Sequence, residues 1–389
     1  MTAGDSSAAG TPDRPRLGWR AGLPASLLGA TWARCCIAAG FVAAHLLAGS
    51  VRLPDGRLHL REGLLTWDGT YYRVLVDGGY ASAPSDAARF FPLYPAVTRL
   101  LAPIVGGRTD VALVLVANVA AVAAALVLWT LVTEALGDTG VAERSAWMLA
   151  LWPAAFVLAF AYSEALFVLT VAAALLLLHR RRFLTAGMVG AAAAVIRPVG
   201  VLLIVPALIE VIGSWRHSNT DDDHRGPPRV IGSVAAVLGP PIGTLTAFWW
   251  IAAASNQPWS TPLAVQRTLR GGFREPVSRL IGAAVDVAGG NFRDLPNLLA
   301  ALLGVALVVV AVRRRQPWSW VAYSVVTLVV ALAANNIDSL GRYLLAAVPL
   351  IVAAAQWADR PRRAQLAAVV GSLGVVAATT AALLGRVVP

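Results

Sequence analysis

The sequence predicts an all-α polytopic membrane protein, and both its composition and its segmentation indicate this class. Hydrophobic residues make up 58% of the 389 positions and charged residues only 14%, whereas a soluble domain carries about 25% charged residues. The apolar character extends along the whole chain, and short arginine clusters divide it into long apolar stretches. We therefore expect one bundle of about 9–12 transmembrane helices rather than several soluble domains.

The chain divides into a short tail and one membrane domain. Residues 1–30 are expected to form a flexible cytoplasmic tail, because the opening is polar and too long before its apolar run for a cleaved signal. Residues 31–389 are expected to form a single transmembrane domain. A spanning helix needs about 20 mainly apolar residues. The candidate spans, several of them short, are roughly Ala33–Val51, Val111–Thr133, Ala146–Phe160, Ala165–Leu178, Val230–Ala254, Leu298–Val312, Trp318–Ala334, Leu344–Trp357 and Gln365–Leu384.

Arginines in short loops predict the orientation, because such loops stay on the cytoplasmic side. The anchors are Arg14, Arg16 and Arg20, then Arg180–Arg182, Arg313–Arg315, and Arg360, Arg362 and Arg363. They agree with one another only if Phe91–Val105 does not cross and Phe183–Trp215 enters and returns, with Arg197-Pro198 near its apex. If Phe183–Trp215 is one kinked helix instead, the later anchors contradict the earlier ones. In the arrangement in which the anchors agree, the N-terminus is cytoplasmic.

Two long segments fall on the extracytoplasmic side in this scheme. They are residues 52–110, with short interfacial helices, and residues 255–297. Long loops translocate largely regardless of charge, so their arginines do not overturn the orientation. They do make the outer face cationic, which suits an anionic lipid phosphate; these arginines are Arg57, Arg61, Arg73, Arg89, Arg267, Arg270, Arg274 and Arg279.

The composition excludes several chemistries. All 32 basic residues are arginine, so a Schiff-base lysine and a phosphate-loop lysine are impossible. The arginines lie in short clusters between apolar runs, which indicates topology rather than a nucleic-acid face. Cys35 and Cys36 are adjacent and the five histidines are scattered, so neither a disulfide framework nor a metal motif can be built. The arginine-rich, lysine-free composition also suggests a bacterial source.

Asp68 is the leading candidate for a catalytic group. It lies in the run Trp67-Asp68-Gly69-Thr70-Tyr71-Tyr72, ahead of a short helix-like segment. Asp is a favoured N-cap residue, so the carboxylate could serve only as a helix cap. Aromatic residues flank it at the membrane interface, however, where a carboxylate could act as a general base on a sugar or lipid head. Phe90-Phe91-Pro92-Leu93-Tyr94-Pro95 is equally well explained as an interfacial aromatic belt or as a substrate contact.

Glu164 follows Tyr162-Ser163 between two apolar runs, and a carboxylate bounded by membrane helices is a candidate for function. Alternatively, Ser163 or Glu164 only starts a helix at the water boundary. Arg197 interrupts an uncharged stretch and needs a partner, either Glu164 or Asp338 as a salt bridge or a lipid phosphate. Arg342, followed by Tyr343, lies at the outer end of a helix and is the better phosphate candidate. Its alternative is an ordinary interfacial anchor.

These segments, taken in order, resemble the PIG-V family, the second mannosyltransferases of glycosylphosphatidylinositol assembly, and its bacterial relatives. That family belongs to the GT-C class of polytopic glycosyltransferases. The resemblance covers most of the chain, from about Asp68 to Pro349, and rests on WDGTYYRVLVDGGY, RFFPLYP, AYSEALF, IRPVG and SLGRYLLAAVPL. Each motif alone is weak, but the ordered set is specific.

The resemblance implies a GT-C-type bundle and an inverting transfer of mannose from a polyprenyl-phosphate-sugar donor on the extracytoplasmic face of the plasma membrane. Asp68 would be the general base. Arg342 first and Arg197 second would bind the donor phosphate, together with Tyr343. The remaining candidate substrate contacts are Trp67, Tyr72, Tyr162, Glu164 and, in the 255–297 loop, Gln266. No cofactor is required, and Asp77 and Asp86 remain open as secondary carboxylates or metal ligands.

The acceptor does not follow from the resemblance, because bacteria generally lack glycosylphosphatidylinositol anchors. A glycolipid or lipoglycan of an actinobacterial envelope is expected in its place, and another sugar than mannose stays possible. Two other functions compete with the enzyme. One is a lipid or polysaccharide transporter, since membrane charges also mark transport pathways, although no internal repeat is visible. The other is a structural subunit of an envelope-assembly complex.

Overall fold

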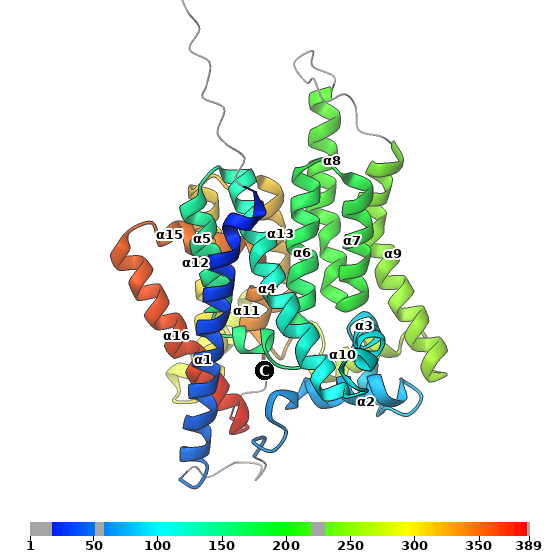
Figure 1. The fold of residues 1–389 in the computed structure, drawn as a ribbon, viewed down its shortest axis with the longest axis vertical. Helices are drawn as coiled ribbons and strands as arrows, with labels where there is room; N and C mark the ends of the chain where they lie inside the picture. The colour runs from blue at the N-terminus through cyan, green and yellow to red at the C-terminus, as the bar shows by residue number, and fades with distance from the viewer. Residues whose placement is uncertain (1–17, 51–57, 219–229, 387–389) are drawn as a thin grey trace, which may run out of the picture.

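The computed structural model describes residues 18–50, 58–218 and 230–386, and within these ranges the chain is a bundle of α-helices with no strands (Figure 1). This confirms the all-α polytopic class. The helices are α1 (Leu23–Leu47), α2 (Asp68–Gly78), α3 (Leu93–Leu101), α4 (Thr109–Leu136), α5 (Thr139–Ala150), α6 (Glu164–His179), α7 (Phe183–Ile196), α8 (Ile204–Ser218), α9 (Val230–Ser255), α10 (Thr261–Arg270), α11 (Pro276–Ala288), α12 (Leu295–Arg313), α13 (Trp318–Leu332), α14 (Leu340–Ala346), α15 (Val348–Trp357) and α16 (Pro361–Leu383).

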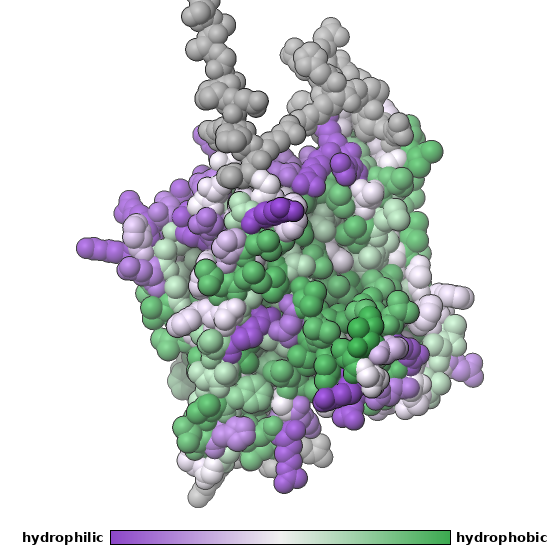
Figure 2. Space-filling view, in the orientation of Figure 1, coloured by the Kyte–Doolittle hydropathy of each residue, from purple (hydrophilic) through white to green (hydrophobic). Residues whose placement is uncertain are grey.

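Six described helices are long and apolar enough to cross a bilayer: α1, α4, α8 with its preceding turn η6 (Pro198–Leu203), α9, α12 and α16. The pair α14 and α15, bent by 86°, adds one broken span. The shorter apolar helices α6, α7 and α13 lie among the long ones in Figure 1. Figure 2 shows the apolar side chains over the middle of the bundle and hydrophilic ones gathered toward its two ends.

The arginine-rich turns lie at one end of the bundle (Figure 1). The turns α6–α7, α12–α13 and α15–α16 are at the top of the view, and α2, α3 and α10 are at the opposite end. The segment 183–215 enters and returns, as the anchors require. Helix α7 ends at Ile196, Arg197 is extended with φ −149° and ψ 141°, and η6 leads into α8. The break follows from Pro198, because a proline disfavours the helical conformation of the residue before it. Arg14, Arg16 and Arg57 lie outside the described residues.

The predicted span 146–160 is wrong. Helix α5 starts earlier, capped by Asp138, whose Oδ1 accepts a hydrogen bond from the amide of Val141 at 2.9 Å, and it ends at Ala150. Residues 151–163 are mostly buried and irregular apart from the short turn η5 (Ala155–Leu158). Hydropathy reports only that the segment is apolar, and Pro153 prevents a continuous helix by removing a backbone donor. The amide of Ala161 donates instead to the carbonyl of Leu64 at 2.9 Å, which joins this segment to the loop that precedes Asp68.

Helix α1 begins at Leu23, so residues 23–30 of the expected tail are helical and the expected start at Ala33 is wrong. Arg34 consequently lies in the middle of a spanning helix. Its Nε and Nη2 donate to Oδ1 of Asn118 on α4 at 2.9 and 2.7 Å. The amide nitrogen of Asn118 donates in turn to the carbonyl of Ala159 at 2.9 Å. Figure 2 shows a hydrophilic patch at mid-height over α1 and α4, within the apolar surface.

Helices α7 and α9 pack with their backbones in close approach. A Cβ at Gly239 would lie 2.1 Å from the carbonyl oxygen of Gly187, and one at Gly243 would lie 2.2 Å from that of Ala191. Only glycine permits this distance, as at many helix crossings within membranes. The contact holds α7, and with it Arg197 at its end, against α9.

Candidate active site

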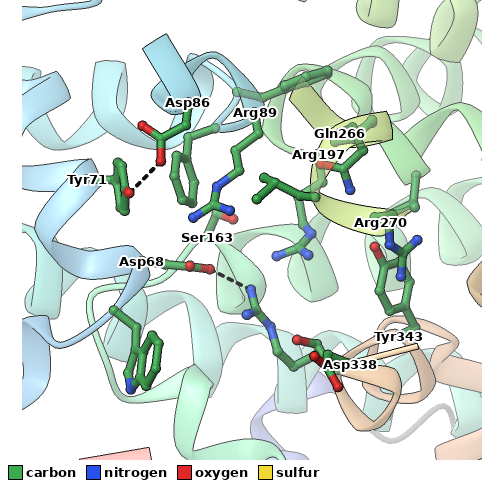
Figure 3. A pocket seen from close by; sticks show the side chains of 18 of the residues that line it. Asp68, Tyr71, Asp86, Arg89, Ser163, Arg197, Gln266, Arg270, Asp338 and Tyr343 are labelled. Atoms are coloured by element: carbon green, nitrogen blue, oxygen red, sulfur yellow. Dashed lines mark hydrogen bonds and ion pairs between the residues drawn. The ribbon is translucent and has the colours of Figure 1, made fainter. Parts of the chain in front are cut away.

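A cavity of about 590 Å³ opens at the end of the bundle that holds α2, α3 and α10 (Figure 3). Its walls come from segments far apart in the sequence: the start of α2, the turn η3 (Ser85–Arg89), the α7–η6 break, the end of α10 and the loop into α14. The lining residues are Trp67, Asp68, Tyr71, Tyr72, Asp86, Arg89, Phe90, Phe91, Ser163, Ile196, Arg197, Pro198, Val199, Gln266, Leu269, Arg270, Asn336, Asp338, Ser339, Arg342 and Tyr343.

Asp68 points into this cavity and does not cap a helix. It is the first residue of α2, Trp67 occupies the N-cap position, and no side chain makes the cap hydrogen bond. The cap explanation of Asp68 is therefore wrong. Trp67 has φ 58° and ψ −114°, a conformation that side-chain-bearing residues rarely adopt. Its indole Nε1 donates to the carbonyl of Ala382 at 2.9 Å, which anchors this strained turn to α16.

Asp68 forms an ion pair with Arg342, from the other end of the sequence. Its Oδ2 accepts a hydrogen bond from Nη2 of Arg342 at 2.8 Å. The Arg342 side chain is only 9% exposed and that of Asp68 18%. The guanidinium also lies over the ring of Tyr162, 5.2 Å from the centroid. Arg342 is therefore held from two sides at the cavity wall, beside the proposed base.

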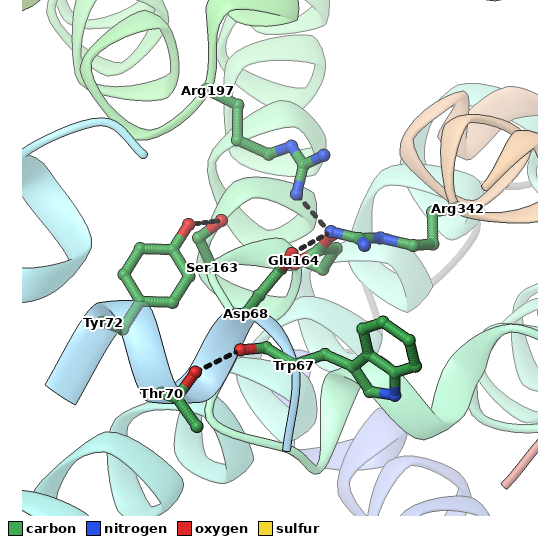
Figure 4. Close-up of polar contacts among 8 residues, drawn as sticks. All are labelled: Trp67, Asp68, Thr70, Tyr72, Ser163, Glu164, Arg197 and Arg342. Carbon is green, nitrogen blue, oxygen red and sulfur yellow. Dashed lines mark hydrogen bonds and ion pairs between the residues drawn. The ribbon is translucent and has the colours of Figure 1, made fainter. Parts of the chain in front are cut away.

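Glu164 joins the two arginines that the sequence singled out (Figure 4). Its Oε1 accepts from Nε of Arg342 at 2.6 Å and forms an ion pair with Nη1 of Arg197. Glu164 is 3% exposed and does not line the cavity. Two carboxylates and two guanidiniums thus form one network, which offsets the cost of burying each charge. Of the two carboxylates expected as salt-bridge partners of Arg197, Glu164 forms the ion pair.

The tyrosines Tyr72 and Tyr162 lie next to this network. The hydroxyl of Tyr72 donates to Oγ of Ser163 at 2.8 Å, so α2 is tied to the residue that precedes Glu164. Tyr162 is fully buried beneath Arg342 and does not line the cavity. Seven of the nine predicted site residues line the cavity, namely Trp67, Asp68, Tyr72, Arg197, Gln266, Arg342 and Tyr343, and the other two lie directly behind it.

The sequence interpretation did not assign several cavity residues to the site. Asp86 lies in the cavity wall, and its Oδ2 accepts a hydrogen bond from the hydroxyl of Tyr71 at 2.6 Å. Burial and this hydrogen bond to Asp86 raise the pKa of Tyr71 above its ordinary value. Arg89 and Arg270 were noted only as outer-loop arginines. The position of Arg89 directly before the RFFPLYP aromatics could have marked it, but no local signal marks Arg270.

Asp77 lies away from the cavity. Its carboxylate accepts from the Thr109 hydroxyl at 2.6 Å and lies 3.8 Å from Nε of Arg73. Within the described ranges, no three His, Cys, Asp or Glu side chains are grouped as metal ligands would be. A second cavity of about 360 Å³ adjoins the first and shares Asn336 and Asp338 with it. The 255–297 segment supplies residues to both, including Gln266 and Arg279.

One family model matches part of this chain. Residues 86–224 match the model of a family described as dolichyl-phosphate-mannose-protein mannosyltransferase. The match covers less than half of the chain but contains Asp86, Arg89, Ser163, Glu164 and Arg197. Asp68, Arg270 and Arg342 lie outside it. Among proteins with curated descriptions, none matches this sequence.

Solved structures with a similar arrangement include three of the oligosaccharyltransferase of Archaeoglobus fulgidus. The first, with Zn and sulfate, has a TM-score of 0.44 at 13% identity and covers 90% of this chain and 52% of that one. The second, tethered to an acceptor peptide, has a TM-score of 0.43 at 11% identity and covers 91% of this chain and 55% of that one. The third, AglB with an inhibitory peptide and a dolichol-phosphate, has a TM-score of 0.43 at 12% identity and covers 91% of this chain and 56% of that one. This chain thus spans about half the length of those proteins.

Proposed function

We propose that this protein is an inverting GT-C glycosyltransferase of the PIG-V type that uses a polyprenyl-phosphate-sugar donor. The observation that carries the proposal is the cavity in which Asp68 lies against Arg342, with Arg342 and Arg197 held by Glu164. A carboxylate beside fixed guanidiniums is the arrangement that a base-assisted transfer from a phosphate leaving group needs. The partial match to a mannosyltransferase family supports the same reaction class.

The chemistry follows from the positions of these groups. Asp68 accepts the proton of the acceptor hydroxyl while the oxygen attacks the anomeric carbon of the sugar. The bond between that carbon and the phosphate oxygen breaks on the opposite face, so the configuration inverts. Negative charge grows on the departing polyprenyl phosphate, and Arg342 stabilises it, with Arg197 beside it. Fixed cations of this kind need no reorganisation during the reaction.

The proposed sugar is mannose and the proposed acceptor a glycolipid or lipoglycan of a bacterial envelope. The proposed location of the site is the extracytoplasmic face of the plasma membrane. In support of this sidedness, the cavity lies opposite the arginine-rich turns, which the positive-inside rule expects on the cytoplasmic side. Trp67, Tyr72, Gln266 and Tyr343 are the proposed substrate contacts on the wall.

Transfer from polyprenyl-phosphate-mannose by the purified Asp68→Asn variant tests the proposal. We expect transfer to fall by about 10²-fold or more, because general base catalysis contributes about 10²–10⁴-fold. Asp77→Asn is the matched control, since Asp77 lies on the same helix but outside the cavity, and it should keep wild-type transfer. An Asp68→Asn variant as active as the wild type would exclude Asp68 as the base.

A further inference from the structure

Arg89 and Arg270 are two further arginines of the cavity wall. Within the described part of the chain, neither lies within 4 Å of a carboxylate oxygen, whereas Arg342 and Arg197 are both held in ion pairs. Figure 3 shows their guanidinium groups on either side of that of Arg197, reaching the cavity from η3 and from α10. They line the same cavity as the proposed base but belong to the covering segments rather than to the buried network.

Aromatic rings, not acids, hold these two guanidiniums in place. Arg89 lies over the rings of Tyr71 and Phe90, at 5.1 and 4.7 Å from their centroids. Arg270 lies over the ring of Tyr343 at 4.7 Å. Stacking on a ring face fixes the plane of a guanidinium and leaves its N–H edges available for an anion. Nε of Arg89 is buried and makes no hydrogen bond within the described residues.

The other carboxylates of the wall do not neutralise them. Asp86 accepts a hydrogen bond from the hydroxyl of Tyr71, and Asp338 accepts one from the side-chain amide of Asn297 at 3.4 Å. Asp68 and Glu164 are already engaged with Arg342 and Arg197. An anion can therefore bind beside Arg89 and Arg270 without breaking an existing ion pair, whereas an anion that binds Arg342 must compete with Asp68.

We propose that Arg89 and Arg270, with the amide of Gln266, form a second phosphate-binding subsite in this cavity. The inference rests on the proposed function, in which Arg342 receives the phosphate that carries the sugar. Guanidinium groups bind phosphate oxygens through paired N–H donors. The second phosphate has two possible sources. One is a phosphodiester in the headgroup of an acidic acceptor lipid, which agrees with a monophosphate donor. The other is a diphosphate linkage in the donor, which would replace the monophosphate donor of the proposed function by its diphosphate counterpart.

Binding without turnover tests the subsite and separates these sources. The purified protein in nanodiscs is titrated with a short-chain isoprenyl monophosphate, the matching isoprenyl diphosphate, phosphatidylglycerol and neutral diacylglycerol. The variants are Arg89→Gln and Arg270→Gln. Matched controls are Arg73→Gln and Arg267→Gln, exposed arginines on α2 and α10 that lie outside the cavity. Monodispersity and the thermal transition confirm that each variant is folded.

If the donor supplies the second phosphate, the wild type binds the diphosphate more tightly than the monophosphate. Both cavity variants should then lose about ten-fold in diphosphate affinity, the scale of one charge-assisted hydrogen bond. If the acceptor supplies it, phosphatidylglycerol binds better than diacylglycerol, and the same variants lose that preference. The control variants should bind like the wild type.

The subsite is overturned if both cavity variants bind all four probes as the wild type does. A protein that binds these phosphates through Arg89 and Arg270 yet transfers no sugar would contradict the proposed function and leave the subsite standing. Loss of transfer in Asp68→Asn with unchanged phosphate binding would agree with both the proposed function and the second phosphate-binding subsite.

Discussion

Glu164 accepts a hydrogen bond from Nε of Arg342 at 2.6 Å, although 178 residues separate them along the chain. The same carboxylate oxygen is paired with Arg197. One buried acid therefore fixes the spacing of two cations, and one of these cations also holds Asp68. The site depends on this contact as much as on the proposed base.

Glu164→Gln should destabilise the protein and reduce transfer. It leaves two buried guanidiniums without their shared counter-charge, and breaking a buried pair costs about 3–5 kcal/mol. Thermal unfolding in detergent measures the effect. Glu134→Gln is the control, because Glu134 pairs with Arg180 at the exposed end of α4 and α6, where a pair is worth about 0–1 kcal/mol. Equal losses in the two variants would contradict the buried network.

Arg34 and Asn118 should be energetically coupled. Asn118→Leu removes the oxygen that accepts two hydrogen bonds from a guanidinium within a spanning helix, so we expect a loss of roughly 1–3 kcal/mol or more. In the double variant Arg34→Leu/Asn118→Leu, the buried guanidinium and its amide partner are both removed. Its loss should be smaller than the sum of the two single losses, as a double-mutant cycle on unfolding free energies would show. Additive losses would rule out the coupling.

Gly239→Ala should disrupt the packing of α7 against α9. The added methyl group would meet the carbonyl oxygen of Gly187 at 2.1 Å, and this backbone atom cannot move without moving α7. We expect about 1–3 kcal/mol of destabilisation, as in other overpacked contacts. Gly213→Ala on α8 is the control, because a Cβ there meets nothing within 4 Å. A thermal transition that is unchanged in Gly239→Ala would show that the helices are not so closely packed.

Single cysteines at the two ends of the bundle should be accessible from opposite sides of the membrane. In a background with Cys35→Ala and Cys36→Ala, Arg73→Cys on α2 is expected to react with a membrane-impermeant maleimide in intact cells. Arg314→Cys, in the α12–α13 turn, should react only after the cells are opened. Labelling of Arg73→Cys only in opened cells would reverse the proposed orientation.

Much of the site could be predicted from the sequence because its key residues are polar groups in apolar surroundings. Glu164 and Arg197 stand out on that ground, whereas Asp68 was singled out by its aromatic neighbours and the family resemblance, and Arg342 by its place at a helix end. The structure brings the four together. Arg34 was missed as a membrane charge, because the first span was placed ten residues late. Arg270 was not assigned because its place at the cavity depends on how α10 lies across the opening.

The sequence by itself determined that the chain is a helical membrane bundle, since burial in lipid requires long apolar runs and each run can be read locally. It also determined which charged residues are unusual because they interrupt or border apolar runs. Only the tertiary structure decided which groups these charges pair with, as when Asp68 pairs with Arg342 instead of capping α2. It also decided that residues 151–163 do not form an α-helix, although they are as apolar as a membrane span. The physical reason is that hydropathy is a sum over neighbours in sequence, whereas an ion pair is a contact between helices whose packing no single segment specifies.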